Sequence, residues 1–257
     1  MTYFCTLASG SEGNCALYVN GRQRILVDAG KNTKYINDAL RQLALSVHDL
    51  THILITHSHS DHVSALPVLL KHTRATLVCS DETFSAIAGR LPFGVPVQLF
   101  TPGEGFWLGQ VPVKTFATSH DAPGSCGYVL GQGSEQVAVC TDLGTMSGEI
   151  FETIRGSRVV LLESNHDGEM VKNGPYPYPL KVRILSDEGH LSNRFAAKVA
   201  VRLAESGTKT VLLAHLSAEN NRPELALETV QSALREAGAV IQVVLAPRSS
   251  VGEPVLL

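Results

Sequence analysis

The sequence predicts a mixed α and β fold, and three observations lead to that expectation. Short runs rich in β-branched and apolar residues alternate with stretches whose apolar positions repeat at helical spacing. This rhythm, in which several strands precede helices, occurs twice along the chain. The length of 257 residues fits one large domain or two small ones, and it is ample for a substantial core.

The composition is that of an ordinary globular protein, with 44% hydrophobic and 18% charged residues. The formal net charge of −3 gives no overall positive field, so any contact with nucleic acid has to be local. We see no signal-peptide pattern and no apolar run near the ~20 residues of a membrane span. Five scattered cysteines, none in a C-x-x-C pair, are typical of reduced core thiols, so we expect a cytoplasmic protein without a membrane partner.

The first half of the chain shows the first strand-and-helix round. The Asn20-Gly21 pair predicts a hairpin between two strands. Thr33 and Asp81 are expected to cap helices, because apolar residues at helical spacing follow each of them. We expect strands at residues 4–7, 15–19, 24–27, 51–56, 75–79 and 97–100, and helices that begin near residues 34, 63 and 82.

The second half repeats the pattern. We expect strands at residues 113–118, 127–130, 136–140, 158–162, 210–214 and 241–245, and helices at 147–154, 194–205 and 223–237. Within it, residues 173–183 contain three prolines that alternate with two tyrosines. Proline fixes one backbone angle, so this stretch predicts a stiff, extended segment.

The most informative stretch is His57-Ser58-His59-Ser60-Asp61-His62, in a loop between a predicted strand and a predicted helix. Neutral imidazole is a good ligand for zinc and similar ions, and carboxylate suits harder ions. Four donors within six residues do not face one ion comfortably, so the spacing suggests two adjacent ions. His57 and His59 serve one ion, and Asp61 and His62 serve the other. The alternative is an exposed loop that is merely rich in histidine.

This H-x-H-x-D-H pattern resembles the signature of the metallo-β-lactamase superfamily of hydrolases. The resemblance implies a four-layer αββα sandwich of class α+β, with two mixed β-sheets flanked by helices, as a single domain over residues 1–257. It also implies a later His, Asp and last His at strand ends, which match His120, Asp142 and His215. The implied ligands of two divalent ions (Zn, Mn or Fe) are His57, His59, Asp61, His62, His120, Asp142 and His215.

Two carboxylates have alternative interpretations. Asp142 bridges the two ions in the superfamily, where a shared carboxylate offsets the repulsion between the cations. Its alternative is the cap of the helix that follows. Asp28, in an Asp28-Ala29-Gly30 sequence, either supports the metal loop or caps a helix or turn. For catalysis, Asp61 or Asp142 is expected to accept the proton of the attacking water.

His190 and Ser192 precede the helix predicted at 194–205, and a helix N-terminus favours anions. The resemblance implies that such a histidine is not a ligand, but touches the scissile phosphate and donates a proton to the leaving oxygen. The alternative is a capping or packing role. Asn193 is a further expected substrate contact.

Three other places are candidate substrate contacts. The Ser9–Asn14 loop is either an ordinary turn or a loop that faces an anion, and similar loops mark nuclease-like branches of the superfamily, so Ser11 and Asn14 are candidates. His166 is a further ligand, a support for the ligands or a substrate contact, and we favour the last two. Tyr176 and Tyr178, close to two basic residues, can stack on bases, or they belong to a rigid surface loop.

The motifs S-G-S-x-G-N, H-S-H-x-D-H, E-x-N-H-D, N-G-P-Y-P and G-H-L-S-N occur in this order. Together they are similar to the compact YycJ/WalJ-type group of the superfamily. This resemblance implies a phosphodiesterase that acts on nucleic acid, DNA rather than RNA, as a 5′→3′ exonuclease. The alternatives are a phosphodiesterase for a cyclic or alkyl ester, a glyoxalase II-type thioester hydrolase, and a metal-loaded binding module. The native metal and the oligomeric state are left open.

Overall fold

A computed structural model describes all residues 1–257 of the chain. Backbone contacts divide the chain into two compact units. Unit 1 consists of Met1–Ala117, Ala122–Cys126 and Pro247–Leu257, and unit 2 consists of Thr118–Asp121 and Gly127–Ala246. The single domain over residues 1–257 stays a prediction.

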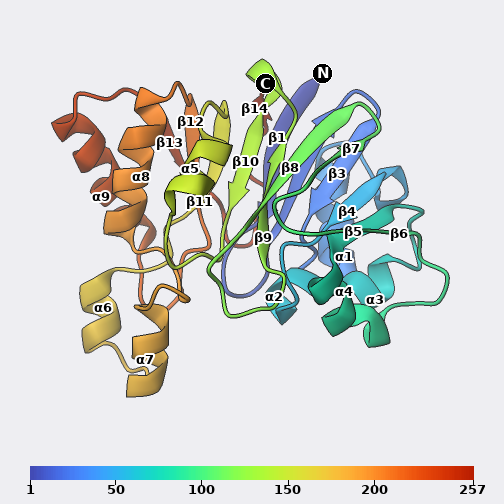
Figure 1. Cartoon of the computed structure of the whole chain (residues 1–257), viewed down its shortest axis with the longest axis horizontal. Helices are drawn as coiled ribbons and strands as arrows, with labels where there is room; N and C mark the ends of the chain where they lie inside the picture. Colours follow the sequence, from blue (N-terminus) through green and yellow to red (C-terminus); the bar gives the residue numbers. More distant parts are fainter. The chain divides into compact units, whose positions relative to one another are not determined.

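Unit 1 contains a seven-stranded mixed sheet (Figure 1). Its order is β14 (Val255–Leu256), β1 (Thr2–Ala8), β2 (Cys15–Asn20), β3 (Gln23–Val27), β4 (His52–Leu54), β5 (Thr76–Ser80) and β6 (Val97–Phe100). The pairs from β14 to β3 are antiparallel, and those from β3 to β6 are parallel. Asn20 pairs with Gln23 across the β2–β3 turn, which confirms the predicted hairpin.

The helical elements of unit 1 follow its parallel strands. They are α1 (Thr33–Gln42), η1 (Val47–Asp49), α2 (Ser60–Val63), α3 (Leu66–Leu69), α4 (Asp81–Ile87) and η2 (Ala88–Arg90). Ile36, Ala39 and Leu40 of α1 are buried, as their helical spacing predicts.

Three helix boundaries in unit 1 differ from the prediction. Asn32, not Thr33, caps α1, and Ser80, not Asp81, caps α4. A cap residue needs an extended backbone outside the helix, and both caps have it. The helix expected from residue 63 is split into α2 and α3, because Pro67 has no N–H to continue a helix and instead lies in the first turn of α3.

Unit 2 contains the strands β13 (Gln242–Leu245), β12 (Thr210–Ala214), β11 (Val159–Glu163), β10 (Val137–Cys140) and β9 (Cys126–Leu130), in that order. They are parallel except for the antiparallel pair β9–β10, so this sheet is also mixed. The strands β7 (Gly105–Leu108) and β8 (Val111–Ala117) form an antiparallel hairpin that belongs to unit 1. The short turn η3 (Gly133–Glu135) joins β9 to β10.

Five helices belong to unit 2: α5 (Gly148–Ile154), α6 (Gly168–Asn173), α7 (Tyr178–Ile184), α8 (Asn193–Glu205) and α9 (Pro223–Glu236). Helices α8 and α9 pack on each other, and α9 packs on β13. Figure 1 shows α6 and α7 side by side, away from the strands of this unit. Ser147 caps α5, so the alternative role of Asp142 as the cap of this helix is wrong.

The extended segment predicted at residues 173–183 is also wrong, because most of it is helix α7. Pro177 is the residue before the helix and Pro179 lies in its first turn, where no N–H is needed. The N–H groups of Leu180 and Lys181 donate to the Pro177 carbonyl. The prolines therefore start a helix here and do not prevent one.

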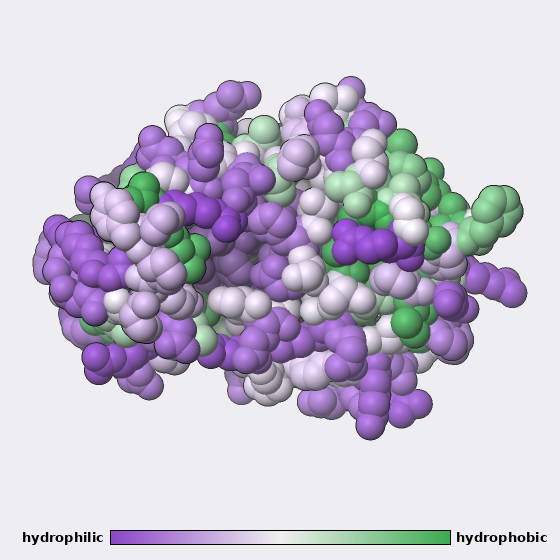
Figure 2. Space-filling model, turned by 90° about the horizontal axis from the view of Figure 1, so that it is seen from below, coloured by the Kyte–Doolittle hydropathy of each residue, from purple (hydrophilic) through white to green (hydrophobic).

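The surface seen in Figure 2 is mostly hydrophilic, and hydrophobic residues gather at the right, on the side where Figure 1 places β5 and β6. Phe93, Val97 and Leu99 are exposed in that part of unit 1. Trp107 is also exposed, on strand β7. The five cysteines are buried and unpaired, as predicted. Not one of the helices is both long and apolar enough to cross a bilayer.

Candidate metal centre

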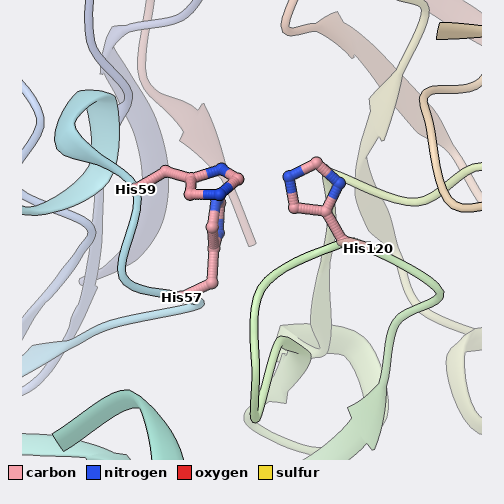
Figure 3. Close-up of side chains that lie close together, drawn as sticks. All are labelled: His57, His59 and His120. Carbon is pink, nitrogen blue, oxygen red and sulfur yellow. The ribbon is translucent and has the colours of Figure 1, made fainter. Parts of the chain in front are cut away.

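The metal loop, residues 57–62, follows β4 in unit 1, and its last three residues form the first turn of α2. The rings of His57 and His59 meet edge to face with centroids 4.7 Å apart, and those of His57 and His62 are 4.1 Å apart. His57 and His62 are fully buried. Figure 3 shows the imidazoles of His57 and His59 close together above this loop. The loop thus brings three imidazoles to one place, as its spacing predicts.

Asp28 anchors this loop from the end of β3. One of its oxygens accepts the N–H of Thr56 at 2.9 Å, and the other lies 2.8 Å from Nδ1 of His62. Because the carboxylate holds Nδ1 of His62, a metal would be bound through Nε2, which here lies 3.1 Å from the side-chain nitrogen of Asn14. The structure therefore supports the first interpretation of Asp28, contact with the metal loop, and the helix cap is Asn32.

The loop at residues 9–14 packs directly against the metal loop. Asn14 donates its backbone N–H to the carbonyl of Asp61 at 2.8 Å, and its side-chain nitrogen lies 3.1 Å from Nε2 of His62. The backbone of Gly30 runs so close that a Cβ there would lie 1.6 Å from the Asp61 carbonyl oxygen. Asn14 is buried in this contact, whereas Ser11 is exposed. Only glycine fits at position 30, which explains the Asp-Ala-Gly sequence.

Unit 2 collects a second group of polar side chains at the carboxyl ends of its parallel strands. Asp142 follows β10, Glu163 ends β11 and His215 follows β12, while His190 lies before α8. The candidate ligand atoms of these four residues lie within 4.8 Å of one another. His120, in the loop after β8 (Figure 3), has its Nε2 3.9 Å from Oδ1 of Asp142.

The backbone is unusual where two of these side chains leave their strands. Asp142 has φ of 57° and His215 has φ of 55°, in the left-handed region that residues with a Cβ rarely adopt. Asp28 shares this conformation, with φ of 62°. Such strain persists only where the surroundings enforce it, and it clusters at functional sites. Here it turns the chain sharply at a strand end.

Glu163 is the residue that sequence analysis missed. It is fully buried, and its Oε1 lies 2.8 Å from Nδ1 of both His190 and His215. Its Oε2 accepts the N–H groups of Leu143 and Leu191. The one signal in the sequence is an acidic residue at the end of an otherwise apolar strand, which has to have partners when buried.

The charges of this group are interdependent. Burial alone would raise the pKa of Glu163, but the charges and hydrogen bonds of His190 and His215 outweigh it and lower the pKa to about 2. Burial works in the opposite direction on His190, and the charge and hydrogen bond of Glu163 prevail, so the pKa of His190 is raised. Nδ1 of His190 also lies 3.9 Å from Oδ1 of Asp142, whose charge likewise favours the protonated imidazole.

Three of the predicted substrate contacts lie in or near the start of α8. The Ser192 hydroxyl caps α8, because it accepts the N–H of Phe195. Asn193 is buried, and its amide bonds to Ser164 and Asn221. His166 is buried next to this turn, and its carbonyl accepts the N–H of Asn193 at 2.8 Å. Burial lowers the pKa of His166 to about 4.

Helix α7 carries or borders the two predicted tyrosines. Tyr178 is 78% exposed on α7, and Tyr176 is half-buried in front of it. Arg183 forms an ion pair at 2.5 Å with Asp121, the neighbour of His120. At the other end of the segment, His190 donates its backbone N–H to the carbonyl of Ile184. Helix α7 is thus tied to the loops that carry His120 and His190.

The donors in the two units are imidazoles and carboxylates, and this set fits zinc, manganese or iron. A protein-family model described as "Beta-lactamase superfamily domain" matches residues 23–216. Since the match covers most of the chain, the protein belongs to the β-lactamase superfamily.

Curated relatives agree with this assignment. The chain is 36% identical over 239 residues to the exodeoxyribonuclease YycJ of Bacillus anthracis, an alignment that covers 92% of this chain and 90% of the relative. It is 34% identical to the exodeoxyribonuclease WalJ of Streptococcus pneumoniae strain D39, over 91% of this chain and 88% of the relative. These matches confirm the predicted similarity to the YycJ/WalJ-type group.

Among solved structures, the metallo-β-lactamase fold protein YhfI from Bacillus subtilis matches with a TM-score of 0.73 and 15% identity. The match covers 98% of this chain and 100% of YhfI. It confirms the predicted fold class, the αββα sandwich of two mixed sheets flanked by helices. The protein is a hydrolase of this superfamily, and the fold implies that it binds divalent metal.

Proposed function

We propose that the protein is a metal-dependent phosphodiesterase that degrades nucleic acid, and that it acts on DNA as a 5′→3′ exonuclease. The observation that carries this proposal is the pair of His190 and Glu163 next to Asp142. Cleavage of a phosphodiester needs a proton donor for the leaving oxygen, and the charge and hydrogen bond of Glu163 raise the pKa of His190, which favours its protonated form. The names of the curated relatives support the choice of DNA over RNA.

We further propose two divalent ions per chain. His57, His59 and His120 would hold one ion, Asp61, His62 and His215 would hold the other, and Asp142 would contribute to both. When bound, such ions lower the pKa of a shared water and polarise the phosphoryl oxygen.

The side chains of this protein perform the remaining steps. Asp61 or Asp142 accepts the proton of the attacking water. Glu163 fixes Nδ1 of His190, so that Nε2 carries the proton that is given to the leaving oxygen. Glu163 also fixes Nδ1 of His215, which leaves Nε2 of that residue for the metal.

The substrate contacts divide into two kinds. We propose that the exposed Tyr178, the adjacent Tyr176, Ser11 and the Ser192 turn contact the strand directly. Tyrosine rings can stack on bases without sequence preference. Asn14, His166 and Asn193 are buried among protein partners, so we propose that they position the residues that make contact.

A panel of substrates tests the function. The purified protein is incubated with Mn²⁺ or Zn²⁺ and with 5′-labelled single-stranded DNA, the matching RNA, and bis(p-nitrophenyl) phosphate. We expect degradation of DNA from the 5′ end, weaker degradation of RNA, and loss of all activity after treatment with a chelator. Turnover of the small ester without degradation of any polymer would contradict the proposal and favour a small-molecule phosphodiesterase.

The tyrosine provides a second, sharper test. Tyr178→Ala removes an exposed ring, so we expect a KM for the DNA strand that is raised roughly tenfold, because one stacked base contributes about 1–3 kcal/mol. The kcat on bis(p-nitrophenyl) phosphate stays unchanged, since that ester is too small to reach α7. Phe93→Ala, which removes an even more exposed ring from unit 1, serves as the control.

A further inference from the structure

A pocket lies in unit 1 beside helix α1, and no residue assigned above to a metal or to substrate lines it. Its volume is about 280 Å³. Its polar walls come from α1, from the turn around η1 and from the segment after α3. The residues that matter for its chemistry are Lys34, Asn37, Arg41, Ser46, His48 and His72.

The wall formed by α1 is one face of that helix. Lys34, Asn37 and Arg41 are separated by three and four residues, so their side chains project on the same side. His48 and His72 add two imidazoles from the other elements, and no carboxylate lines the pocket. A pocket with two cations, two imidazoles and neutral hydrogen-bonding groups suits an anion with several oxygens.

Two acidic residues, Asp38 and Asp49, are nearby, but neither of them lines the pocket. Oδ1 of Asp38 lies 3.6 Å from a guanidinium nitrogen of Arg41, but both side chains are exposed, and such pairs contribute little. The carboxylate of Asp49 is occupied by the N–H and hydroxyl groups of Ser46 at 2.8 and 2.9 Å. On the other side, residues 66–76 carry Lys71 and Arg74 and no acidic residue. In a chain with a net charge of −3, this is a locally basic surface.

We propose that this pocket binds phosphate groups carried by nucleotides, and that its occupant is a nucleic-acid strand held away from the reacting phosphate. Lys34 and Arg41 are seven residues apart, roughly 10 Å along the helix axis, so they form a track and not a single point. His48 and His72 are exposed imidazoles, a ring type on which an unpaired base can stack. The choice of a strand rests on the proposed nuclease function, whereas the phosphate chemistry rests on the pocket alone.

A charge-matched pair of double variants tests the proposal. Lys34→Ala with Arg41→Ala removes two cations from the pocket, and Arg22→Ala with Lys114→Ala removes two exposed cations elsewhere in unit 1. Binding of a labelled single-stranded oligonucleotide to the metal-loaded protein is followed by fluorescence anisotropy over a series of salt concentrations. All four side chains are exposed, so thermal denaturation should show little change in stability.

We expect the pocket variant to bind the strand at least tenfold more weakly. The slope of log K against log salt should become shallower by about 1.4, because each lost phosphate contact on a single strand removes ~0.7. The control variant should keep the affinity and slope of the wild type, and both variants should turn over bis(p-nitrophenyl) phosphate normally. Equal losses in the two variants, or no loss in the pocket variant, would overturn the proposal.

A competition arm separates the two sources of phosphate. In this arm, dAMP is added to the protein with the labelled oligonucleotide bound. If dAMP lowers the anisotropy with the wild type but not with the pocket variant, the pocket also binds a free mononucleotide. If dAMP has no effect while the pocket variant loses the strand, only the strand is bound. Pocket-dependent binding without any cleavage of nucleic acid would refute the proposed function and leave this proposal standing.

Discussion

At the scale of single residues, one buried carboxylate organises the polar group of unit 2. Glu163 contacts His190 and His215 with the same oxygen and two backbone N–H groups with the other. An isosteric Glu163→Gln change removes the charge that raises the pKa of His190. We expect turnover to fall roughly 10–100-fold, the range found for groups that orient metal-site histidines.

The pH profile distinguishes this role from a purely structural one. In the proposed mechanism His190 donates a proton, so activity should be lost as the pH rises through its raised pKa. In Glu163→Gln that pKa falls, and the alkaline limb of kcat for bis(p-nitrophenyl) phosphate should move to lower pH. The exposed Glu169→Gln is the control and should leave the limb in place. An unmoved limb in Glu163→Gln would show that Glu163 does not set the charge of His190.

His166 makes the stability of the fold depend on pH. Its pKa is lowered from 6.5 to about 4 by burial, so the unfolded chain takes up a proton that the folded chain refuses. The free energy of unfolding is therefore not reduced by His166 above about pH 6.5, and it decreases as the pH falls towards 4. The shift corresponds to roughly 3 kcal/mol. Urea unfolding at pH 7.5 and 5 should show a larger loss of stability for the wild type than for His166→Gln, whereas equal losses would contradict this account.

At the scale of elements, each predicted metal residue follows a strand, either in a loop or, for Asp61 and His62, in the short helix α2. Close backbone contacts hold the metal loop in place. Gly30 illustrates the constraint, since a Cβ at this position would overlap the carbonyl of Asp61 in the metal loop. Gly30→Ala should therefore displace the loop and lower the metal content of the purified protein. Elemental analysis and thermal unfolding measure both effects.

The control is a glycine with free space around it. A Cβ at Gly148, in the first turn of α5, would meet nothing within 4 Å, so Gly148→Ala should keep the metal content and the stability of the wild type. A Gly30→Ala protein that retains its full metal content would show that the approach of these two loops is not needed to form the site.

Helix α7 shows the limit of local reasoning at this scale. The alternating prolines and tyrosines predict an extended segment, yet residues 178–184 are helical. The helix is stabilised by contacts outside the segment, which include the ion pair of Arg183 with Asp121 and the bond of Lys181 to the carbonyl of Lys172. Proline restricts a backbone angle but does not choose between a helix start and an extended chain.

At the scale of the whole molecule, the five cysteines report on the integrity of the core. All are buried and unpaired, and burial raises the pKa of Cys5, Cys15, Cys79 and Cys140. The thiolate is the reactive form, so the folded protein should react slowly with Ellman's reagent at pH 8, and all five thiols should react in denaturant.

These raised pKa values also determine the direction in which the stability of the fold changes with pH. An unfolded thiol loses its proton above about pH 8.5, while the folded thiols keep theirs, so stability should fall as the pH rises beyond that value.

In the experiment with Ellman's reagent, a thiol that reacts rapidly in the native protein at pH 8 would contradict the burial of its side chain.

The sequence by itself determined the α+β class, most strands and the metal loop, because alternating patterns and contiguous donors are properties of neighbouring residues. The resemblance to the superfamily pointed to His120, Asp142 and His215, which follow predicted strands. Only the tertiary structure decided the role of Glu163, the partners of Asp28 and the helical state of α7. The reason is physical: Glu163 and His215 are 52 residues apart, and Asp28 and His62 are 34 apart. Folding alone decides which distant group satisfies a buried charge.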